Sequence, residues 1–470
     1  MAGTQALPHA RRGHRGPRQA RRPEEGPSLR WWIRHRLWIP PVLGAVLGAG
    51  LGVLFVLPPL PVARVLRGVA WYATATEARS MLSSVLGITL TSLSIVLSLS
   101  MLVVQNAAGQ YSPRLLRLFL HSAGIRVVIP VFVATSVFCL VASQAFGFAS
   151  EAERAPRPAL ALAMVLLISS EGALIFQVLQ TLQLMRVENL VRRVRQDTLG
   201  AARLLERFRS VDIQESAPLR ALTKDPERGW PLRARGDGFI ASVDAKALLE
   251  VATGHQLIIH VDRAVGEPVI QGEPVGWIEA EARGPRSRRE PTEARVCRAI
   301  RLDRWRDEDR DIALGVRQLV DVAIKALSPG INDPYTAVEA VDQLTFLLCE
   351  LSRMHLGPRV LADDSGTPRV FLRGPALSDY LALATDQILR YGATEPAVVL
   401  RLLRLAAAVG QLAREAEDRR AARERLHSIL TVSEQAHPAA PRHALLRRYA
   451  EALEQGLDGG AWPPLPAIGF

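Results

Sequence analysis

The sequence contains very little lysine, although it is strongly basic. Of its 470 residues only three are lysines, Lys224, Lys246 and Lys325, so arginine carries almost all of the formal net charge of +12. Such a balance is typical either of a protein with an anionic partner or of an arginine-rich membrane protein that needs charges for its topology. No nucleic-acid-binding motif with interleaved aromatic residues accompanies the charge, so we expect no nucleic-acid partner.

Cysteine is also scarce, and the motifs of common catalytic sites are missing. The three cysteines, Cys139, Cys297 and Cys349, lie far apart, and neither a CxxC pair nor an HxxxH pair occurs. We therefore expect no structural zinc site and no other metal or cofactor. There is also no GxSxG motif, no phosphate-binding P-loop and no GxGxxG that opens a helix after a strand. These absences predict that the protein is not an enzyme.

Long apolar runs, by contrast, are plentiful. Four stretches, near residues 37–57, 84–104, 127–148 and 160–182, each supply the roughly 20 residues that a helix needs to cross a bilayer. Buried helices of soluble proteins are usually shorter and carry a charged face. We therefore predict a bundle of four transmembrane helices over residues 29–185, with the lipid bilayer as its surroundings and a disordered basic arm over residues 1–28 before it.

Arginines near the ends of these runs predict the orientation of the bundle. Because basic residues concentrate on the cytoplasmic side of membrane proteins, the arginines that precede the first run and follow the fourth should lie in the cytoplasm. We therefore expect a multi-pass protein of the bacterial inner membrane with both termini cytoplasmic. The arginines on this side are Arg30, Arg34, Arg36, Arg114, Arg117, Arg126, Arg186, Arg192, Arg193 and Arg195.

Small residues form stripes along the first two predicted helices. Gly44, Gly48 and Gly52 recur every four residues, which places them on one face and permits close approach of a partner helix. In the second run, Gly87 is followed at helical spacing by the hydroxyl residues Thr91, Ser94 and Ser98. That hydroxyl stripe could line a path for a solute or ion. It could equally serve tight helix packing, with each hydroxyl bonded to a backbone carbonyl.

Glu171 is the one acidic residue in the middle of an apolar run. A carboxylate at that depth costs several kcal/mol unless it is protonated or paired, so such residues often mark functional sites. A structural role is the alternative, in which Gln144 or a hydroxyl of the second run satisfies a neutral carboxylic acid. Either interpretation predicts that Glu171 faces the interior of the bundle.

The chain after the fourth run predicts an α+β cytoplasmic domain with a small β-rich part and a helical half. We expect the fourth span to continue into a charged helix from Met185 to about Arg209. The predicted divisions are a connecting helix and linker over 186–235, a β-rich subdomain over 236–304, a helical subdomain over 305–458 and a loose tail over 459–470. Within them we predict strands near 238–244, 256–261 and 296–302, turn-rich hairpins near 265–280 and 360–372, and helices near 245–253, 312–326, 334–351, 376–391, 395–414, 419–435 and 442–454.

The most promising candidate ligand site is the loop from Ser328 to Tyr335, together with Asp311. Asn332 and Asp333 precede Pro334, a pattern that starts a helix and leaves free backbone N–H groups that could bind an anion or nucleotide. A plain helix–turn–helix with capping side chains explains the same residues without a ligand. The candidate residues are Asp311, Ser328, Gly330, Asn332 and Asp333, and Arg306 could pair with Asp311 in a purely structural contact.

Three segments resemble a bacterial family catalogued as domain of unknown function 2254. They are Arg235–Glu279, Tyr111–Leu116, and above all the run RWRDEDRDIALGVRQLVDVAIKALSPGINDPYTAVEAVDQL, in which Ala326–Thr336 is the most specific part. The resemblance implies a predicted membrane protein over most of the chain and brings no activity with it. This sequence has Asp307 where threonine is common in the family and Arg310 where glutamine is common. Ser169-Ser170-Glu171 stands where histidine is expected.

Two classes of function follow from these patterns. The first is an oligomeric channel or transporter-like protein with a cytoplasmic gating or sensing domain, indicated by the hydroxyl stripe, Glu171 and the continuous fourth helix. The second is a membrane-anchored interaction or regulatory module without transport, indicated by the glycine face of the first run. A membrane enzyme is a remote third. Because four helices are too few to enclose a wide pore, the first function predicts a homo-oligomer, and the sequence does not specify the ion or small ligand.

Overall fold

The computed structural model describes residues 38–56, 70–110, 123–148, 154–184, 186–207, 229–280, 289–307, 309–436 and 442–467. The basic arm, Tyr111–Leu116 and the arginines at positions 30, 34, 36, 114 and 117 lie outside these residues. The chain divides into two compact units. We call residues 1–96 with 121–177 the apolar bundle, and residues 97–120 with 178–470 the C-terminal unit.

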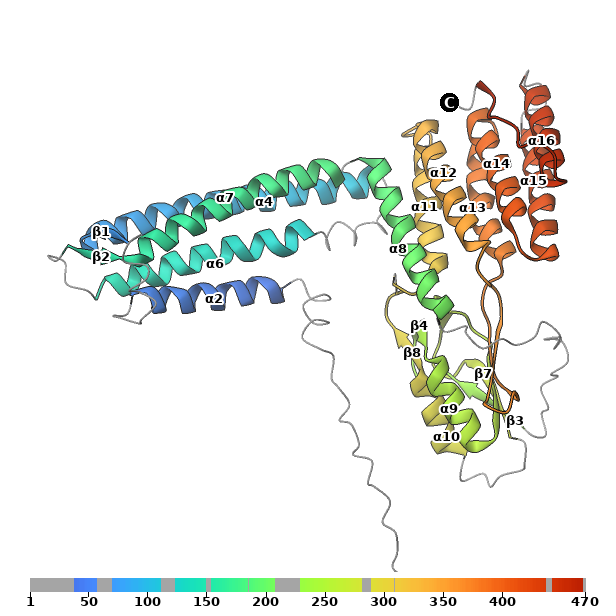
Figure 1. Ribbon diagram of the computed structural model, residues 1–470, viewed down its shortest axis with the longest axis horizontal. Helices are drawn as coiled ribbons and strands as arrows, with labels where there is room; N and C mark the ends of the chain where they lie inside the picture. Colours follow the sequence, from blue (N-terminus) through green and yellow to red (C-terminus); the bar gives the residue numbers. More distant parts are fainter. Residues whose placement is uncertain are drawn as a thin grey trace, which may run out of the picture. The chain divides into compact units, whose positions relative to one another are not determined.

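The four predicted apolar runs are confirmed as four helices. They are α2 (Ile39–Val56), α4 (Ala75–Gln110), α6 (Ala123–Phe146) and α7 (Pro158–Leu184), drawn in blue to green in Figure 1. Each is long and apolar enough to cross a membrane, with a mean hydropathy of 2.1 over its most apolar window. The helix α4 begins well before the predicted run because Thr74 and Glu77 form a capping box: each side chain accepts the other's backbone N–H.

A short antiparallel pair joins two connections of the apolar bundle. Strand β1 (Trp71–Ala73) precedes α4, strand β2 (Ala155–Arg157) precedes α7, and Trp71 pairs with Arg157. The guanidinium of Arg157 also lies 5.2 Å from the ring centre of Phe146 on α6. Strands of three residues show no detectable alternation, so this pair could not be predicted from the sequence.

The prediction that the fourth apolar helix continues without a break is wrong. The helix α7 ends at Leu184, and a separate helix α8 (Val187–Arg207) follows it. The side-chain amide of Asn189 donates to the backbone oxygen of Gln183 at 3.0 Å, which satisfies a carbonyl at the end of α7. Glu188 then lies in the first turn of α8, where a negative charge favours a new helix start.

The C-terminal unit contains two sheets and two helices that pack against them. Five strands form one sheet in the order β3 (Gly229–Arg233), β7 (Pro274–Ala280), β5 (Leu257–Val261), β10 (Pro368–Leu372) and β9 (Arg359–Ala362). Three strands form the other, in the order β6 (Pro268–Val269), β4 (Gly238–Val243) and β8 (Ile300–Asp303). The helices are α9 (Ala245–His255) and α10 (Arg289–Ala299).

Two strand predictions in this region need correction. Residues 265–280 do not form a hairpin, because β6 pairs with β4 in one sheet while β7 pairs with β5 and β3 in the other. The strand expected over 296–302 begins only at Ile300, since residues up to Ala299 belong to α10. Val296 and Ala299 are apolar and buried on that helix, and in the sequence they resemble the buried residues of a strand.

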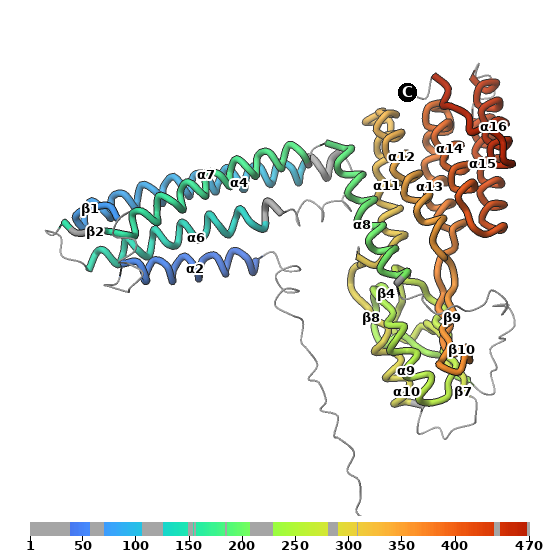
Figure 2. The backbone as a smooth tube through the Cα atoms, in the orientation of Figure 1, coloured from blue at the N-terminus to red at the C-terminus, as the bar shows by residue number. Residues whose placement is uncertain are grey.

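The predicted hairpin near 360–372 forms β9 and β10, and it joins the five-stranded sheet. Strand β10 runs parallel to β5, with Val370 opposite Ile259, although the two lie far apart in the chain. Figure 2 shows this hairpin leaving the helical layer to reach the sheet. The sheet therefore combines segments from both predicted cytoplasmic subdomains.

The helical half forms as predicted and carries the larger core. It consists of α11 (Ile312–Ala326), α12 (Pro334–Leu351), α13 (Leu377–Gly392), α14 (Pro396–Leu412), α15 (Ala416–Ala436) and α16 (His443–Leu457). The helix α8 packs into the same core through Leu190, Val191 and Val194, which are almost fully buried among the apolar faces of these helices. The helix that follows the fourth apolar helix in the chain is thus part of the C-terminal unit.

Candidate functional site

A cavity of the C-terminal unit lies at one edge of the five-stranded sheet. It has a volume of about 500 Å³. Residues that follow β5 and β10 line it, and Arg359, the first residue of β9, lies at the same edge opposite Leu372. Because β5 and β10 are parallel, their carboxyl ends meet here, which is where open sheets commonly bind ligands. Leu204 and Leu205 at the end of α8 complete the wall.

Asp311 lines this cavity at the start of α11. Its carboxylate is 1% exposed and binds Arg306 through two contacts, Nε to Oδ2 at 2.6 Å and Nη2 to Oδ1 at 2.9 Å. It also accepts the backbone N–H of Leu314 at 2.9 Å, which caps the helix. The predicted pairing with Arg306 is therefore confirmed, and the negative charge of Asp311 is compensated within the protein.

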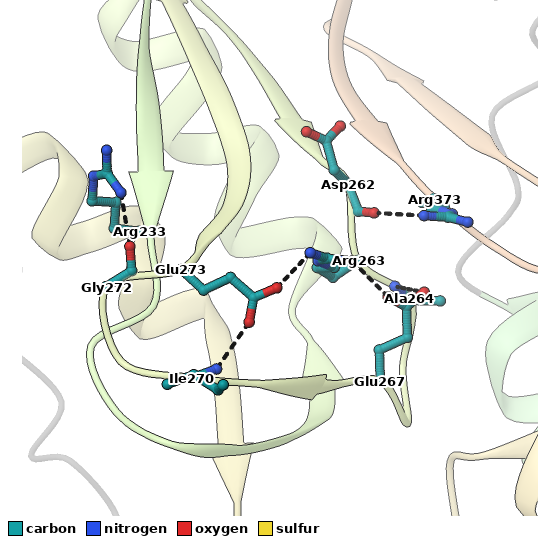
Figure 3. A network of polar contacts seen from close by, with 9 residues as sticks. All are labelled: Arg233, Asp262, Arg263, Ala264, Glu267, Ile270, Gly272, Glu273 and Arg373. Carbon is teal, nitrogen blue, oxygen red and sulfur yellow. Dashed lines mark hydrogen bonds and ion pairs between the residues drawn. The ribbon is translucent and has the colours of Figure 1, made fainter.

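Arg263 is a second lining residue whose charge is compensated. Its guanidinium contacts Glu273 at 2.5 Å and Glu267 at 3.5 Å, as Figure 3 shows. Both glutamates also accept backbone N–H groups, of Ala264 and Ile270. The network fixes the turn after β5 and leaves Arg263 with little charge to offer a ligand.

Arg359 and Arg373 are held at the cavity by backbone carbonyls, which carry no net charge. The Nη1 of Arg359 donates to the oxygen of Leu205 on α8 at 3.3 Å, and the Nη1 of Arg373 donates to the oxygen of Asp262 at 3.3 Å (Figure 3). Burial lowers the pKa of Arg359, partly offset by Tyr380, yet an arginine stays charged at neutral pH. Two guanidinium groups therefore face the cavity without a carboxylate partner among the described residues.

Lys246 and Arg310 add two further cations at the cavity rim. Lys246 lies in the first turn of α9, and Arg310 lies directly before Asp311. Both are exposed, and neither pairs with a carboxylate in the part of the chain that the structure describes. The carboxylate of Asp244, also in the lining, accepts the N–H of Ala247 as the cap of α9.

The predicted loop site does not lie at this cavity. Ser328, Gly330, Asn332 and Asp333 follow the end of α11, whereas Asp311 precedes its start, and a helix of 15 residues is roughly 22 Å long. The structure thus separates Asp311 from the other four candidates.

In that loop, side chains and backbone groups satisfy one another. Asp333 accepts the N–H and the hydroxyl of Thr336, at 3.1 and 2.6 Å, and these bonds lower its pKa. The hydroxyl of Ser328 donates to the oxygen of Lys325. Asn332 has the left-handed backbone that such a tight turn requires, with φ of 52°, and Gly330 is exposed. The geometry is that of a capped helix–turn–helix.

Glu171 contacts a hydroxyl of the second apolar helix, as one of the two sequence interpretations expected. Ser92 on α4 donates to its Oε1 at 2.8 Å, and Ser92 is buried while Glu171 is half-buried. Beside it, Ser170 on α7 and Thr135 on α6 share a hydrogen bond of 3.0 Å. The polar side chains of three helices therefore meet inside the apolar bundle.

The glycine face of α2 packs within its own chain, against α6. An added Cβ at Gly44 would lie 2.6 Å from the carbonyl oxygen of Pro130, and one at Gly48 would overlap the oxygen of Ala134. At Gly52 it would meet the side chain of Val141 at 3.0 Å. Close helix approach is confirmed, but this face is already occupied and no longer supports self-association.

The hydroxyl stripe on α4 faces away from the rest of the bundle. Thr91, Ser94 and Ser98 are exposed in the single chain, as is Gly87, whereas the buried face of α4 carries Thr89 and Ser92. The hydroxyl of Thr91 donates to the oxygen of Gly87 at 2.9 Å. Packing among the residues that the structure describes therefore does not explain the stripe.

Comparison with known proteins agrees with the four apolar helices. Residues 34–408 match the family described as predicted membrane protein, DUF2254. The chain belongs to this family. Uncharacterised proteins of Mycobacterium bovis and Mycobacterium tuberculosis H37Rv are each 29% identical over 382 residues, which cover 81% of this chain and 73% of theirs. No solved structure matches the chain. Membership brings the description of a membrane protein and no activity.

No pattern in the sequence marks the cationic residues of the cavity as a site. Arg263, Arg359 and Arg373 come together only because β5, β10 and β9 are neighbours in one sheet, and that pairing joins segments about a hundred residues apart. One local signal was present: Arg263 and Arg373 each come one or two residues after an apolar strand. Without the parallel pairing, that signal does not distinguish a site from a solvated turn.

Proposed function

We propose that this chain is an inner-membrane protein that crosses the bilayer four times with both termini in the cytoplasm. In this proposal it assembles as a homo-oligomer through α4, and the oligomer conducts an ion or small solute under the control of the C-terminal unit. The uncovered hydroxyl stripe of α4 carries the proposal. Gly87, Thr91, Ser94 and Ser98 of the stripe are all exposed in the single chain, as are Ser80 and Ser84, which extend the same face toward the start of α4.

The stripe is suited to contact with another helix. Its spacing of four and three residues keeps it on one side of α4, roughly opposite the buried residues Val85, Thr89 and Val96. Small side chains let two backbones approach closely, and in lipid such close packing is a main source of helix association. Hydroxyls bonded to their own helix, as Thr91 and Ser84 are, tolerate either a helix partner or a water-filled path.

Control by the C-terminal unit is supported by the position of α8. This helix begins at Val187, shortly after α7 ends at Leu184, and is buried in the helical core through Val191 and Val194. Its far end reaches the cavity through Leu204 and Leu205. A ligand in the cavity would therefore contact the helix that is joined in sequence to the fourth apolar helix.

Cysteine cross-linking in membranes tests the assembly. In a background with Cys139→Ala, Cys297→Ser and Cys349→Ser, Ser94→Cys should form a disulfide-linked dimer on mild oxidation. Leu97→Cys is the matched control, because Leu97 is equally exposed on α4 but is turned roughly 100° from the centre of the stripe. Equal cross-linking at both positions, or at neither, would contradict assembly through the stripe.

A flux assay in proteoliposomes separates the two classes of function. The chain is reconstituted in vesicles loaded in turn with potassium, chloride or phosphate, and release is measured against empty vesicles. Cross-linking through Ser94 together with flux of one of these ions supports the transporter-like function. Cross-linking without flux of any of them favours the alternative, a membrane-anchored regulatory module.

A further inference from the structure

We propose that the cavity of the C-terminal unit binds a small organic anion with an apolar body. The proposal concerns a ligand, whereas the function above concerns assembly and flux. It rests on the residues of the C-terminal unit alone, so a negative flux or cross-linking result leaves it unaffected.

The charges in the lining favour an anion. Arg263 is neutralised by its glutamates and Asp311 by Arg306, as described above. Four cations remain against the carboxylate of Asp244 and the one glutamate in excess over Arg263, which leaves an excess of two positive charges around the cavity. The four cations are Lys246, Arg310, Arg359 and Arg373.

The placement of these cations indicates a site and not a scattered surface charge. Arg359 and Arg373 come from the same sheet edge, where the carboxyl end of β10 meets the first residue of β9. Each is held in place by a carbonyl oxygen, which orients the guanidinium without neutralising it. A charged anion in the cavity would supply the missing counter-charge, and arginine is well suited to bind a planar or tetrahedral anionic group.

The rest of the lining favours an apolar body. Leu204, Leu205, Val243, Val265, Ile312 and Leu356 contribute aliphatic surface. Among the described lining residues, only Ser242 and the buried Tyr380 carry a hydroxyl group, so the hydroxyls of a sugar would find few uncharged partners. A volume of about 500 Å³ lies in the range of small-molecule sites and has room for one or two fused rings with an acidic group.

A pair of probes with the same shape tests the role of charge. Naphthalene-2-sulfonate is an anion, and naphthalene-2-sulfonamide is its neutral counterpart. Binding of each to the full chain in lipid nanodiscs is measured by calorimetry, with empty nanodiscs as the blank. We expect the sulfonate to bind with a Kd below about 1 mM and the sulfonamide to bind at least about tenfold more weakly. Equal binding of the two, or binding of neither, would overturn the proposal.

A third probe tests the apolar body. Glucose 6-sulfate carries a sulfate group, with the same single negative charge, on a polar sugar. It should bind more weakly than the sulfonate, because its sugar hydroxyls find few partners in an aliphatic cavity. If it binds more tightly, the assignment of an apolar body is wrong.

Two matched substitutions locate the binding. Arg373→Gln removes a cation of the cavity, whereas Arg353→Gln removes an equally exposed arginine that pairs with Glu350 away from it. We expect Arg373→Gln to weaken sulfonate binding about fivefold and to leave sulfonamide binding unchanged, which also shows that the variant is folded. Arg353→Gln should change neither. Equal losses in both variants would show that the sulfonate responds only to general surface charge.

Discussion

The contact between α2 and α6 makes a quantitative prediction about Gly44. A methyl group there would lie 2.6 Å from the carbonyl oxygen of Pro130 and 3.2 Å from its backbone carbon atoms. A carbon–oxygen contact needs roughly 3.3 Å. The atoms that this methyl group would meet belong to the backbone of α6, so no side chain can rotate away. The two helices must therefore separate by about 0.7 Å, the difference between the two distances.

That separation weakens the whole interface. A gap of this size forfeits about a quarter to a half of each dispersion contact, and overpacking of this kind typically costs about 1–3 kcal/mol. We therefore expect Gly44→Ala to destabilise the apolar bundle by about 2 kcal/mol. Gly48→Ala should cost more, since its methyl would overlap a carbonyl oxygen, and Gly52→Ala less, since the side chain of Val141 can adjust.

Gly50 provides the matched control on the same helix. It is exposed, and no atom lies within 4 Å of an added Cβ, so Gly50→Ala gains helix propensity without a clash. Cys139, fully buried on α6, reports opening of the bundle. In a Cys297→Ser and Cys349→Ser background, its maleimide labelling is measured over a series of dodecyl maltoside–SDS mixtures. If Gly44→Ala protects Cys139 as well as Gly50→Ala does, the packing argument is refuted.

Three further predictions concern single side chains. Asp311→Ala should lower the unfolding free energy of the C-terminal unit by about 3 kcal/mol, measured by chemical denaturation, because it leaves the partly buried Arg306 unpaired. Burial raises the pKa of Cys349 to about 11, so its alkylation by iodoacetamide should keep rising about tenfold per pH unit up to that pH, whereas an ordinary thiol levels off near 8.5. A plateau near pH 9 would contradict this. Glu171→Gln should leave folding and any flux unchanged within about twofold, because the amide oxygen can accept the hydroxyl of Ser92. A much larger loss of flux would give the carboxylate a part in transport.

Local patterns were enough to predict most of the helices, although not α10 or the separation of α8 from α7. The four apolar runs exceed the length of ordinary core helices, and the helices after Asp311 carry both an apolar period and clear start signals. Asp244, Asp311 and Asp333 each cap the helix that follows, as their side-chain bonds to N–H groups show. All of these signals act within one turn of helix, so a single sequence displays them.

The sheets and the cavity could not be predicted, because they depend on pairing between distant segments. Residues 265–280 look like a hairpin, yet their two strands belong to different sheets. Nothing near β9 and β10 indicates that they will pair with β5. The asymmetry of α4 is a similar case: the spacing of the stripe is visible in the sequence, but only the positions of α6 and α7 show which face is covered.

The helix α11 links the cavity to α8 through two close approaches, and this gives the control proposed above a physical path. At its start, Gly266 has a left-handed backbone with φ of 91°, and an added Cβ would overlap the carboxylate of Asp311. Along its length, an added Cβ at Gly315 would overlap the hydroxyl of Thr198 on α8. Packed elements without space between them move together and do not absorb a displacement. We therefore expect a ligand that shifts the turn at Gly266 to displace α11, and α11 to displace α8 with it.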